Sequence, residues 1–180
     1  MTKAPLLLLV TGPSGAGKST ACEAFAETAP GTWAYVSQDA IRQFVKAGFA
    51  SPVGEWTEEV GTQWDVSIKI CADMARRYVE AGISCVVDGF APPPMGDFDK
   101  WEEPFRGLDF KLVVLLPSED TAVSRNAQRS GSACLEETMV RNDHRWFSAW
   151  HDEPTATIID STELSPSQVV KTMRSFIKGE

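Results

Sequence analysis

The segment from Gly12 to Ser19 has the residue types and the spacing of a loop that binds phosphate groups. It matches the pattern G-x-x-x-x-G-K-[ST], in which glycines let backbone N–H groups turn inward around a β-phosphate. Lys18 is placed to bridge the β- and γ-phosphates, and the Ser19 hydroxyl is placed to bind Mg²⁺. A helical pattern follows the loop, so the partial positive charge of a helix N-terminus adds to the attraction. The predicted contacts to a Mg-nucleoside triphosphate are Gly12, Pro13, Ser14, Gly15, Ala16, Gly17, Lys18, Ser19 and Thr20.

A second residue for the metal site is predicted at Asp88, which follows the apolar run 83–87. In parallel sheets, ligands bind outside the carboxyl ends of the strands. An acid at the end of a strand near the phosphate loop therefore has the position to hold the waters around Mg²⁺. The alternative is that Asp88 and Gly89 only form a turn, since both residue types are common there. We expect Ser19 and Asp88 to be the metal-binding residues.

Asp39 and Arg42 follow another apolar run, 33–36, and are candidates for contact with a phosphate acceptor. An Asp at this edge of the sheet is placed to accept the proton of an attacking hydroxyl, and Arg42 is placed to hold an anionic part of the acceptor. Alternatively, Asp39 only caps the helix predicted at 40–47, a position that Asp favours. The residue types do not decide between these two roles.

Two pairs of arginines have a spacing of four residues on predicted helices. Like charges at this spacing repel by a few tenths of a kcal/mol. A bound triphosphate would offset this repulsion between Arg125 and Arg129, so the pair is a candidate for phosphate binding. Surface arginines exposed to solvent are the plain alternative. Arg141 and Arg145 repeat the spacing, and for them pairing with nearby aspartates is an equal alternative to phosphate binding.

Apolar runs and helical patterns alternate along the chain. Strands are predicted at 6–10, 33–36, 83–87, 110–116 and 156–159. Helices are predicted at 18–29, 40–47, 57–81, 118–130 and 135–150, with a last helix opening at 165 through a capping box. Uniformly apolar strands are typical of a parallel sheet between helical layers. The pattern predicts one five-stranded α/β domain over residues 1–180, with a surface loop at 92–96.

Length and charge narrow the classes of function. A chain of 180 residues suits one domain, and it holds no apolar run long enough to span a bilayer, so we expect a cytoplasmic protein. The net charge of −8 disfavours long nucleic acids and anionic membranes as partners. The four cysteines have no metal-binding or disulfide spacing. Trp56 lies in an irregular stretch where an acceptor would dock, and either stacking on a ring or plain burial fits it.

The whole chain resembles the P-loop kinase group, which includes adenylate kinases, phage-type polynucleotide 5′-kinases and chloramphenicol phosphotransferases. Residues 38–43 (Gln-Asp-Ala-Ile-Arg-Gln) are similar to the acceptor segment of polynucleotide kinases, and 87–90 (Val-Asp-Gly-Phe) to a motif of adenylate kinases. Residues 124–129 resemble the lid helix of both, and 159–162 resemble the loop that closes over adenine. The resemblance implies a three-layer fold with a parallel sheet of order 2-3-1-4-5 and a short lid near 130–134.

The same resemblance implies a role for each matched residue. Asp39 is the implied general base, and Arg42 the implied contact to an acceptor phosphate. Asp88 is implied to organise Mg²⁺ through water. Arg125 is implied to pack on adenine, while Arg129 reaches the phosphates.

Two departures from the family pattern concern the acceptor. Adenylate kinases follow Asp-Gly-Phe with Pro-Arg, and that Arg grips AMP, whereas Ala91 and Pro92 stand at those places here. The lid, 130–134, is also too short for the large lid of long adenylate kinases. Residues 101–116 are more similar to chloramphenicol phosphotransferase. Together these features favour a small hydroxylated acceptor over AMP.

The sequence thus predicts an ATP-dependent kinase that transfers a γ-phosphoryl group to a hydroxyl or phosphate of a small molecule, with ATP and Mg²⁺ as cofactors. Lys18, Asp39 and Arg129 are the predicted catalytic residues. One alternative is a polynucleotide 5′-hydroxyl kinase with the same machinery. Another is a P-loop ATPase that acts as a protein-binding switch. The chain lacks the Asn-Lys-x-Asp element with which switch GTPases read guanine, so ATP is the expected nucleotide.

Overall fold

The computed structural model describes residues 4–93, 97–130 and 134–178, and its centre is a parallel sheet. The strand order is β2-β3-β1-β4-β5, and each neighbouring pair runs parallel. The strands are β1 (Leu7–Thr11), β2 (Trp33–Ser37), β3 (Ser84–Asp88), β4 (Phe110–Leu115) and β5 (Thr157–Ile159). This confirms the predicted five-stranded parallel fold and its strand order.

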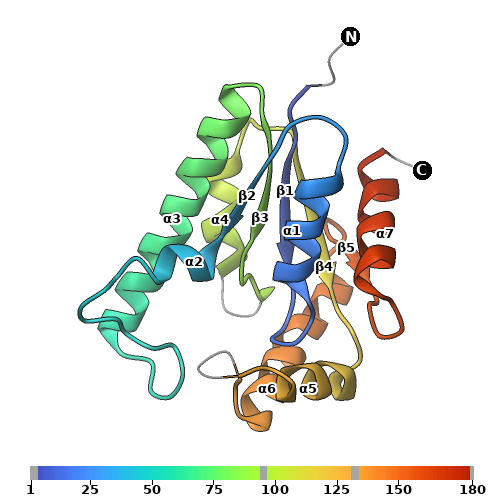
Figure 1. Ribbon diagram of the computed structural model, residues 1–180. Coiled ribbons are helices and arrows are strands. Elements are labelled where there is room, and N and C mark those ends of the chain that lie inside the picture. Colours follow the sequence, from blue (N-terminus) through green and yellow to red (C-terminus); the bar gives the residue numbers. More distant parts are fainter. Residues whose placement is uncertain (1–3, 94–96, 131–133, 179–180) are drawn as a thin grey trace.

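Helices cover both faces of this sheet (Figure 1). On one face lie α1 (Lys18–Thr28) and α7 (Pro166–Lys178), and on the other lie α3 (Glu58–Glu80) and α4 (Asp97–Phe105). The short α2 (Gln38–Arg42) follows β2. The helices α5 (Glu119–Ala127) and α6 (Glu137–Ser148) lie beside the carboxyl ends of the strands, and a 3-10 turn, η3 (Ala149–Asp152), follows α6.

The central strand β1 shows why the sheet is covered on both sides. All five of its residues are fully buried, and alternate side chains point to opposite faces of a strand. Leu7 and Leu9 belong to the hydrophobic cluster under α3, whereas Leu8 and Val10 belong to the cluster under α1 and α7. The uniformly apolar run is therefore the signature of two cores, one on each face.

The register of the sheet brings the ends of three strands to one edge. Val10 of β1 and Ser37 of β2 both pair with Asp88 of β3. The loops that follow β1, β2 and β3 consequently start side by side. This edge carries the phosphate loop, Asp88 and the helix that contains Asp39.

Two predicted helix ends are wrong, and one helix was not predicted. The helix after β2 ends at Arg42 instead of Ala47, and Phe44 beyond it is 72% exposed, so no apolar burial supports a further turn. The helix α5 ends at Ala127, short of the predicted residue 130. The helix α4 was missed; Trp101 and Phe105, one turn apart, are both buried beneath it.

The last helix opens as predicted. The backbone N–H of Ser165 donates to Oε1 of Gln168, and the N–H of Gln168 donates to Oγ of Ser165, which completes the capping box.

Two predicted loops are only partly covered: residues 94–96 of the loop at 92–96 and residues 131–133 of the lid lie outside the described residues.

Candidate active site

The phosphate loop joins the end of β1 to the start of α1 through glycines that no other residue replaces without strain. Gly15 has a φ of +83°, and a Cβ placed on it would lie 2.1 Å from the carbonyl oxygen of Ala122. Gly17, with a φ of +87°, is the N-cap of α1, and no side chain accepts a hydrogen bond from the first turn. The N–H groups at this helix start therefore remain available to an anion.

Lys18, the first residue of α1, points back over this loop. Its Nζ donates to the carbonyl oxygen of Gly12 at 2.8 Å and to that of Pro13 at 3.1 Å. The ammonium group is thereby held against the same loop that presents the N–H groups. A positive charge and a set of backbone donors converge on one place, as polyphosphate binding requires.

Ser19 and Asp88 come together across the gap between α1 and β3. The Ser19 hydroxyl donates to Oδ2 of Asp88 at 2.6 Å, and the Tyr35 hydroxyl donates to the same oxygen at 3.4 Å. Burial raises the pKa of the Asp88 carboxyl, while the charge of Lys18 and the hydrogen bond from Ser19 act in the opposite direction. Burial likewise raises the pKa of Tyr35.

The pair of Ser19 and Asp88 fits a Mg²⁺ ion. Magnesium prefers oxygen ligands, keeps several waters and usually takes one or two protein groups together with substrate phosphates. A hydroxyl and a carboxylate in contact beneath the phosphate loop supply that set. No cluster of three or more His, Cys, Asp or Glu side chains suited to a metal occurs among the described residues, so the donor set resembles that of a nucleotide-bound Mg²⁺ more than that of an all-protein cage.

Asp39 and Arg42 lie on α2, immediately beyond the end of β2. The predicted alternative that Asp39 caps this helix is wrong, because Oγ of Ser37 accepts from the N–H of Ala40 and Ser37 is the N-cap. The Asp39 side chain is 80% exposed and lies 4.0 Å from Nη1 of Arg42. The Arg42 side chain is only 5% exposed, so it is not freely presented at the surface. Burial lowers the pKa of Arg42, and the charge of Asp39 partly offsets this.

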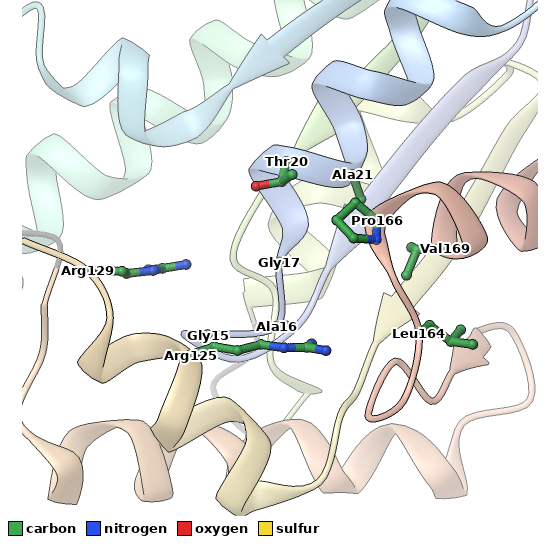
Figure 2. A pocket seen from close by; sticks show the side chains of 10 residues that line it. All are labelled: Gly15, Ala16, Gly17, Thr20, Ala21, Arg125, Arg129, Leu164, Pro166 and Val169. Carbon is green, nitrogen blue, oxygen red and sulfur yellow. The ribbon is translucent and has the colours of Figure 1, made fainter.

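Arg125 and Arg129 line one cavity of about 250 Å³ beside the phosphate loop (Figure 2). Arg125 belongs to α5, whereas Arg129 lies past the end of that helix, so the two do not share a helical face as predicted. Nη2 of Arg125 donates to the carbonyl oxygens of Ser161 and Thr162 at 2.9 and 3.2 Å. The opposite wall is apolar and consists of Leu164, Pro166 and Val169.

The second arginine pair lies away from the phosphate loop. Arg141 forms ion pairs with Glu119 and Glu137, and Nη1 of Arg145 donates to Oδ1 of Asn142 at 3.3 Å. The structure therefore shows Arg141 paired with carboxylates. Its partners are two glutamates and Asp120, which are not the aspartates expected from the sequence.

Asp143 belongs to the site, although the sequence suggested it only as a partner for neighbouring arginines. Its Oδ2 accepts a hydrogen bond from the Ser14 hydroxyl at 2.6 Å, which ties α6 to the phosphate loop. The residue is buried, and this burial raises the pKa of its carboxyl, whereas the hydrogen bond from Ser14 and the charge of Lys18 lower it. The signal that would have found it is an acid on the inner, apolar side of α6, next to Val140 and Phe147.

The raised pKa of Asp143 predicts a pH-dependent effect of Asp143→Asn on stability. Because the folded protein holds this proton more tightly than the unfolded chain, the contribution of Asp143 to stability falls as pH rises above the ordinary aspartate pKa of about 3.9. Asparagine keeps an acceptor for Ser14 and removes the titration. We therefore expect the free energy of unfolding of Asp143→Asn, relative to wild type, to rise from pH 4 to pH 7. Urea unfolding at both pH values measures it, and an unchanged difference would contradict the assignment.

A second residue missed from the sequence, Asn126, ties the end of α5 to Leu135. Its Nδ2 donates to the carbonyl oxygen of Leu135 at 2.8 Å, and its Oδ1 accepts from the N–H of Leu135 at 3.1 Å. Asn126 is buried at the end of α5, so these reciprocal bonds join the end of that helix, which carries Arg125, to the segment that leads into α6. A polar residue at a core position of a predicted helix was the available signal.

Comparisons with known proteins agree with this arrangement. A family model described as an AAA domain matches residues 7–154. No curated protein matches the sequence.

Across residues 4–93, 97–130 and 134–178, none of the helices combines the length and apolar character that a membrane crossing needs.

Several solved structures share the fold at low sequence identity. A sugar kinase from a Janibacter species has a TM-score of 0.69 and 17% identity, over 97% of this chain and 95% of that chain. A gluconokinase from Sinorhizobium meliloti has a TM-score of 0.64 and 19% identity, over 99% of both chains. A tunicamycin resistance protein from Deinococcus radiodurans has a TM-score of 0.66 and 14% identity, over 96% and 95%. The predicted resemblance to the P-loop kinase group is confirmed at the level of family and fold.

Proposed function

Because the chain belongs to the AAA domain family, we propose that it is an ATP-dependent kinase, which transfers the γ-phosphoryl group of Mg-ATP to a hydroxyl of a small-molecule acceptor. The proposal includes a single domain over residues 1–180 that works in the cytoplasm with a short lid near 130–134. The kinases among the structures of the same fold agree with this choice.

The observation that carries the proposal is the meeting of three strand ends at one edge of the sheet. The pairing of Val10 and Ser37 with Asp88 sets the phosphate loop, the Ser19–Asp88 pair and the start of α2 side by side. Asp39 is two residues beyond Ser37, and its negative charge is close enough to raise the pKa of Asp88. This arrangement supports a solvent-accessible carboxylate near the phosphate loop, which a kinase needs and a simple nucleotide-binding switch does not.

The transfer step follows from this placement. The oxygen of the acceptor hydroxyl attacks the γ-phosphorus, and the new O–P bond forms while the bond from that phosphorus to the bridging oxygen of ADP breaks. The hydroxyl proton passes to the Asp39 carboxylate. Lys18 and Arg129 stabilise the negative charge on the phosphoryl oxygens. Ser19, and Asp88 through water, would hold a Mg²⁺ ion, which would supply further charge neutralisation for the phosphates.

The cavity beside the loop suits the adenosine part of the donor. It has a guanidinium on one side and three apolar side chains on the other, which is a suitable setting for a planar base. Arg125 is held in place by the carbonyl oxygens of Ser161 and Thr162, so its plane is fixed before a base arrives.

The experiment that tests the proposal measures consumption of γ-labelled ATP in the presence of Mg²⁺, with and without acceptors. The acceptor panel contains sugars, nucleosides, small ring-bearing alcohols and oligonucleotides with a free 5′-hydroxyl. A small-molecule kinase moves the label onto a low-molecular-weight product. Full-speed release of phosphate without any acceptor would identify an ATPase instead, and labelling of the oligonucleotide alone would identify a polynucleotide kinase.

A further inference from the structure

Aromatic side chains form a connected wall next to Asp39. This aromatic wall consists of Phe49, Trp56, Trp64 and Phe90. The rings of Trp56 and Trp64 lie 5.6 Å apart between centroids, and those of Trp64 and Phe90 lie 5.7 Å apart, both edge to face. Phe49 is 45% exposed and Trp56 is 51% exposed, so the outer half of the wall faces solvent.

The wall is continuous with the edge at which transfer is proposed. Phe90 is two residues past Asp88, and its N–H donates to Oε1 of Gln38 at 2.9 Å. Gln38 precedes Asp39 on α2, and its Nε2 donates to Oγ of Ser67 on α3 at 3.2 Å. The helix that carries the proposed base and the inner end of the wall are thus fastened together by one buried side chain.

Arg42 is built into the wall. Its guanidinium carbon lies 5.2 Å from the centroid of Phe49 and 4.9 Å from that of Trp64, so the cation packs over both rings. Nη2 donates to the carbonyl oxygen of Ala50 at 3.1 Å. A guanidinium that is buried and partly balanced by Asp39 is poorly presented for binding a phosphate on an acceptor.

The charges on the two sides of the site differ. The donor side combines Lys18, Arg125 and Arg129 around one loop and cavity. The exposed segment 43–57 on the acceptor side carries Lys46 and Glu55, which balance each other in formal charge. This balance offers no net attraction to an anionic acceptor, whereas Phe49 and Trp56 offer a large apolar surface.

Two N–H donors in the wall point to an oxygen on the ligand. Nε of Arg42 and Nε1 of Trp64 are buried and have no hydrogen-bond partner in the structure. Buried donors are normally paired. An uncharged ligand oxygen that reaches them would satisfy one or both.

We propose that the acceptor is an uncharged hydroxylated compound with a planar ring, and that its ring packs against the aromatic wall while one of its oxygens accepts from Arg42 or Trp64. The wall then presents the reacting hydroxyl to Asp39. This proposal rests on the kinase function proposed above and names the class of its acceptor. It assigns Arg42 to positioning of the wall instead of to contact with an acceptor phosphate.

The test measures binding separately from transfer, so that failure of the acceptor class is distinguishable from failure of the kinase function. Calorimetry with the Mg-ADP-loaded protein compares two trios: thymidine, 2-deoxyribose and thymidine 5′-monophosphate, and phenyl β-glucoside, glucose and glucose 6-phosphate. We expect the ring-bearing uncharged member of at least one trio to bind about tenfold more tightly than its two counterparts. Transfer of label from ATP to the same compounds is measured in parallel and reports on the kinase function alone.

A matched pair of variants locates the binding. Trp56→Ala should weaken binding of the preferred compound about tenfold. Tyr78→Ala removes an exposed aromatic at the opposite end of α3, roughly 30 Å away along the helix, and should leave it unchanged. The proposal is overturned if the phosphate-bearing or ring-free members bind as well as the ring-bearing ones, if no ring-bearing probe binds at millimolar concentration, or if both variants behave alike.

Discussion

Lys18→Met is expected to reduce transfer by about 10²- to 10³-fold and to remove measurable heat of association with Mg-ATP. Methionine has a similar length and no charge, so the change removes the ammonium group and little volume. In the structure this group is held against the loop by the carbonyl oxygens of Gly12 and Pro13. Loss of a positive charge from the centre of a polyphosphate site weakens both donor binding and stabilisation of the charge that develops during transfer.

Lys69→Met is the matched control for this experiment. Lys69 is an exposed lysine on α3, remote in sequence from the loop, and its replacement should leave nucleotide binding and transfer at wild-type levels. Isothermal calorimetry and steady-state kinetics on the two variants separate a specific effect from a general effect of lost charge. Wild-type affinity for Mg-ATP in Lys18→Met would rule out the phosphate loop as the donor site.

Asp39→Asn is expected to lower kcat by about 10²- to 10⁴-fold while the affinity for Mg-ATP stays unchanged. Asparagine keeps the size of the side chain but does not accept a proton from the acceptor hydroxyl. The Asp39 side chain is 80% exposed and lies 4.0 Å from Nη1 of Arg42, so solvent can take over the interactions of the carboxylate and we expect little change in the free energy of unfolding.

The control for the base is Asp73→Asn, which removes an exposed carboxylate from α3. Single-turnover transfer measures the chemical step directly, and titration with Mg-ATP measures donor binding. If Asp39→Asn transferred the phosphoryl group at the wild-type rate, another group would have to take the proton. If it lost ATP affinity instead, Asp39 would belong to the donor site.

The two variants probe different halves of the same edge. Lys18→Met acts on the donor, and Asp39→Asn acts on the acceptor, although both side chains follow strands that flank β3 in the sheet. A loss of transfer in both, with nucleotide binding lost in only the first, is the pattern that a kinase produces. A protein-binding switch that only hydrolyses ATP would be insensitive to the second change unless Asp39 positioned the attacking water.

Local sequence determined the parts of this protein that depend on short stretches of chain. The strand Leu7–Thr11 is apolar from Leu7 to Val10 because both of its faces are covered, and this is readable from consecutive residues. The loop at Gly12–Ser19 is readable because its glycines, Lys18 and Ser19 are neighbours in sequence. The caps at Ser118 and Ser165 also follow local rules, since each accepts from an N–H three residues ahead.

Only the tertiary structure decided which distant residues meet. Asp143 contacts Ser14 across 129 positions, and Arg42 packs over Phe49 and Trp64, although the sequence predicted that it would hold an anionic part of the acceptor. Helix ends at Arg42 and Ala127 were likewise set by burial instead of propensity. The physical reason is that packing and desolvation are properties of surfaces brought together by the whole fold, whereas turn geometry and capping are satisfied within a few residues of backbone.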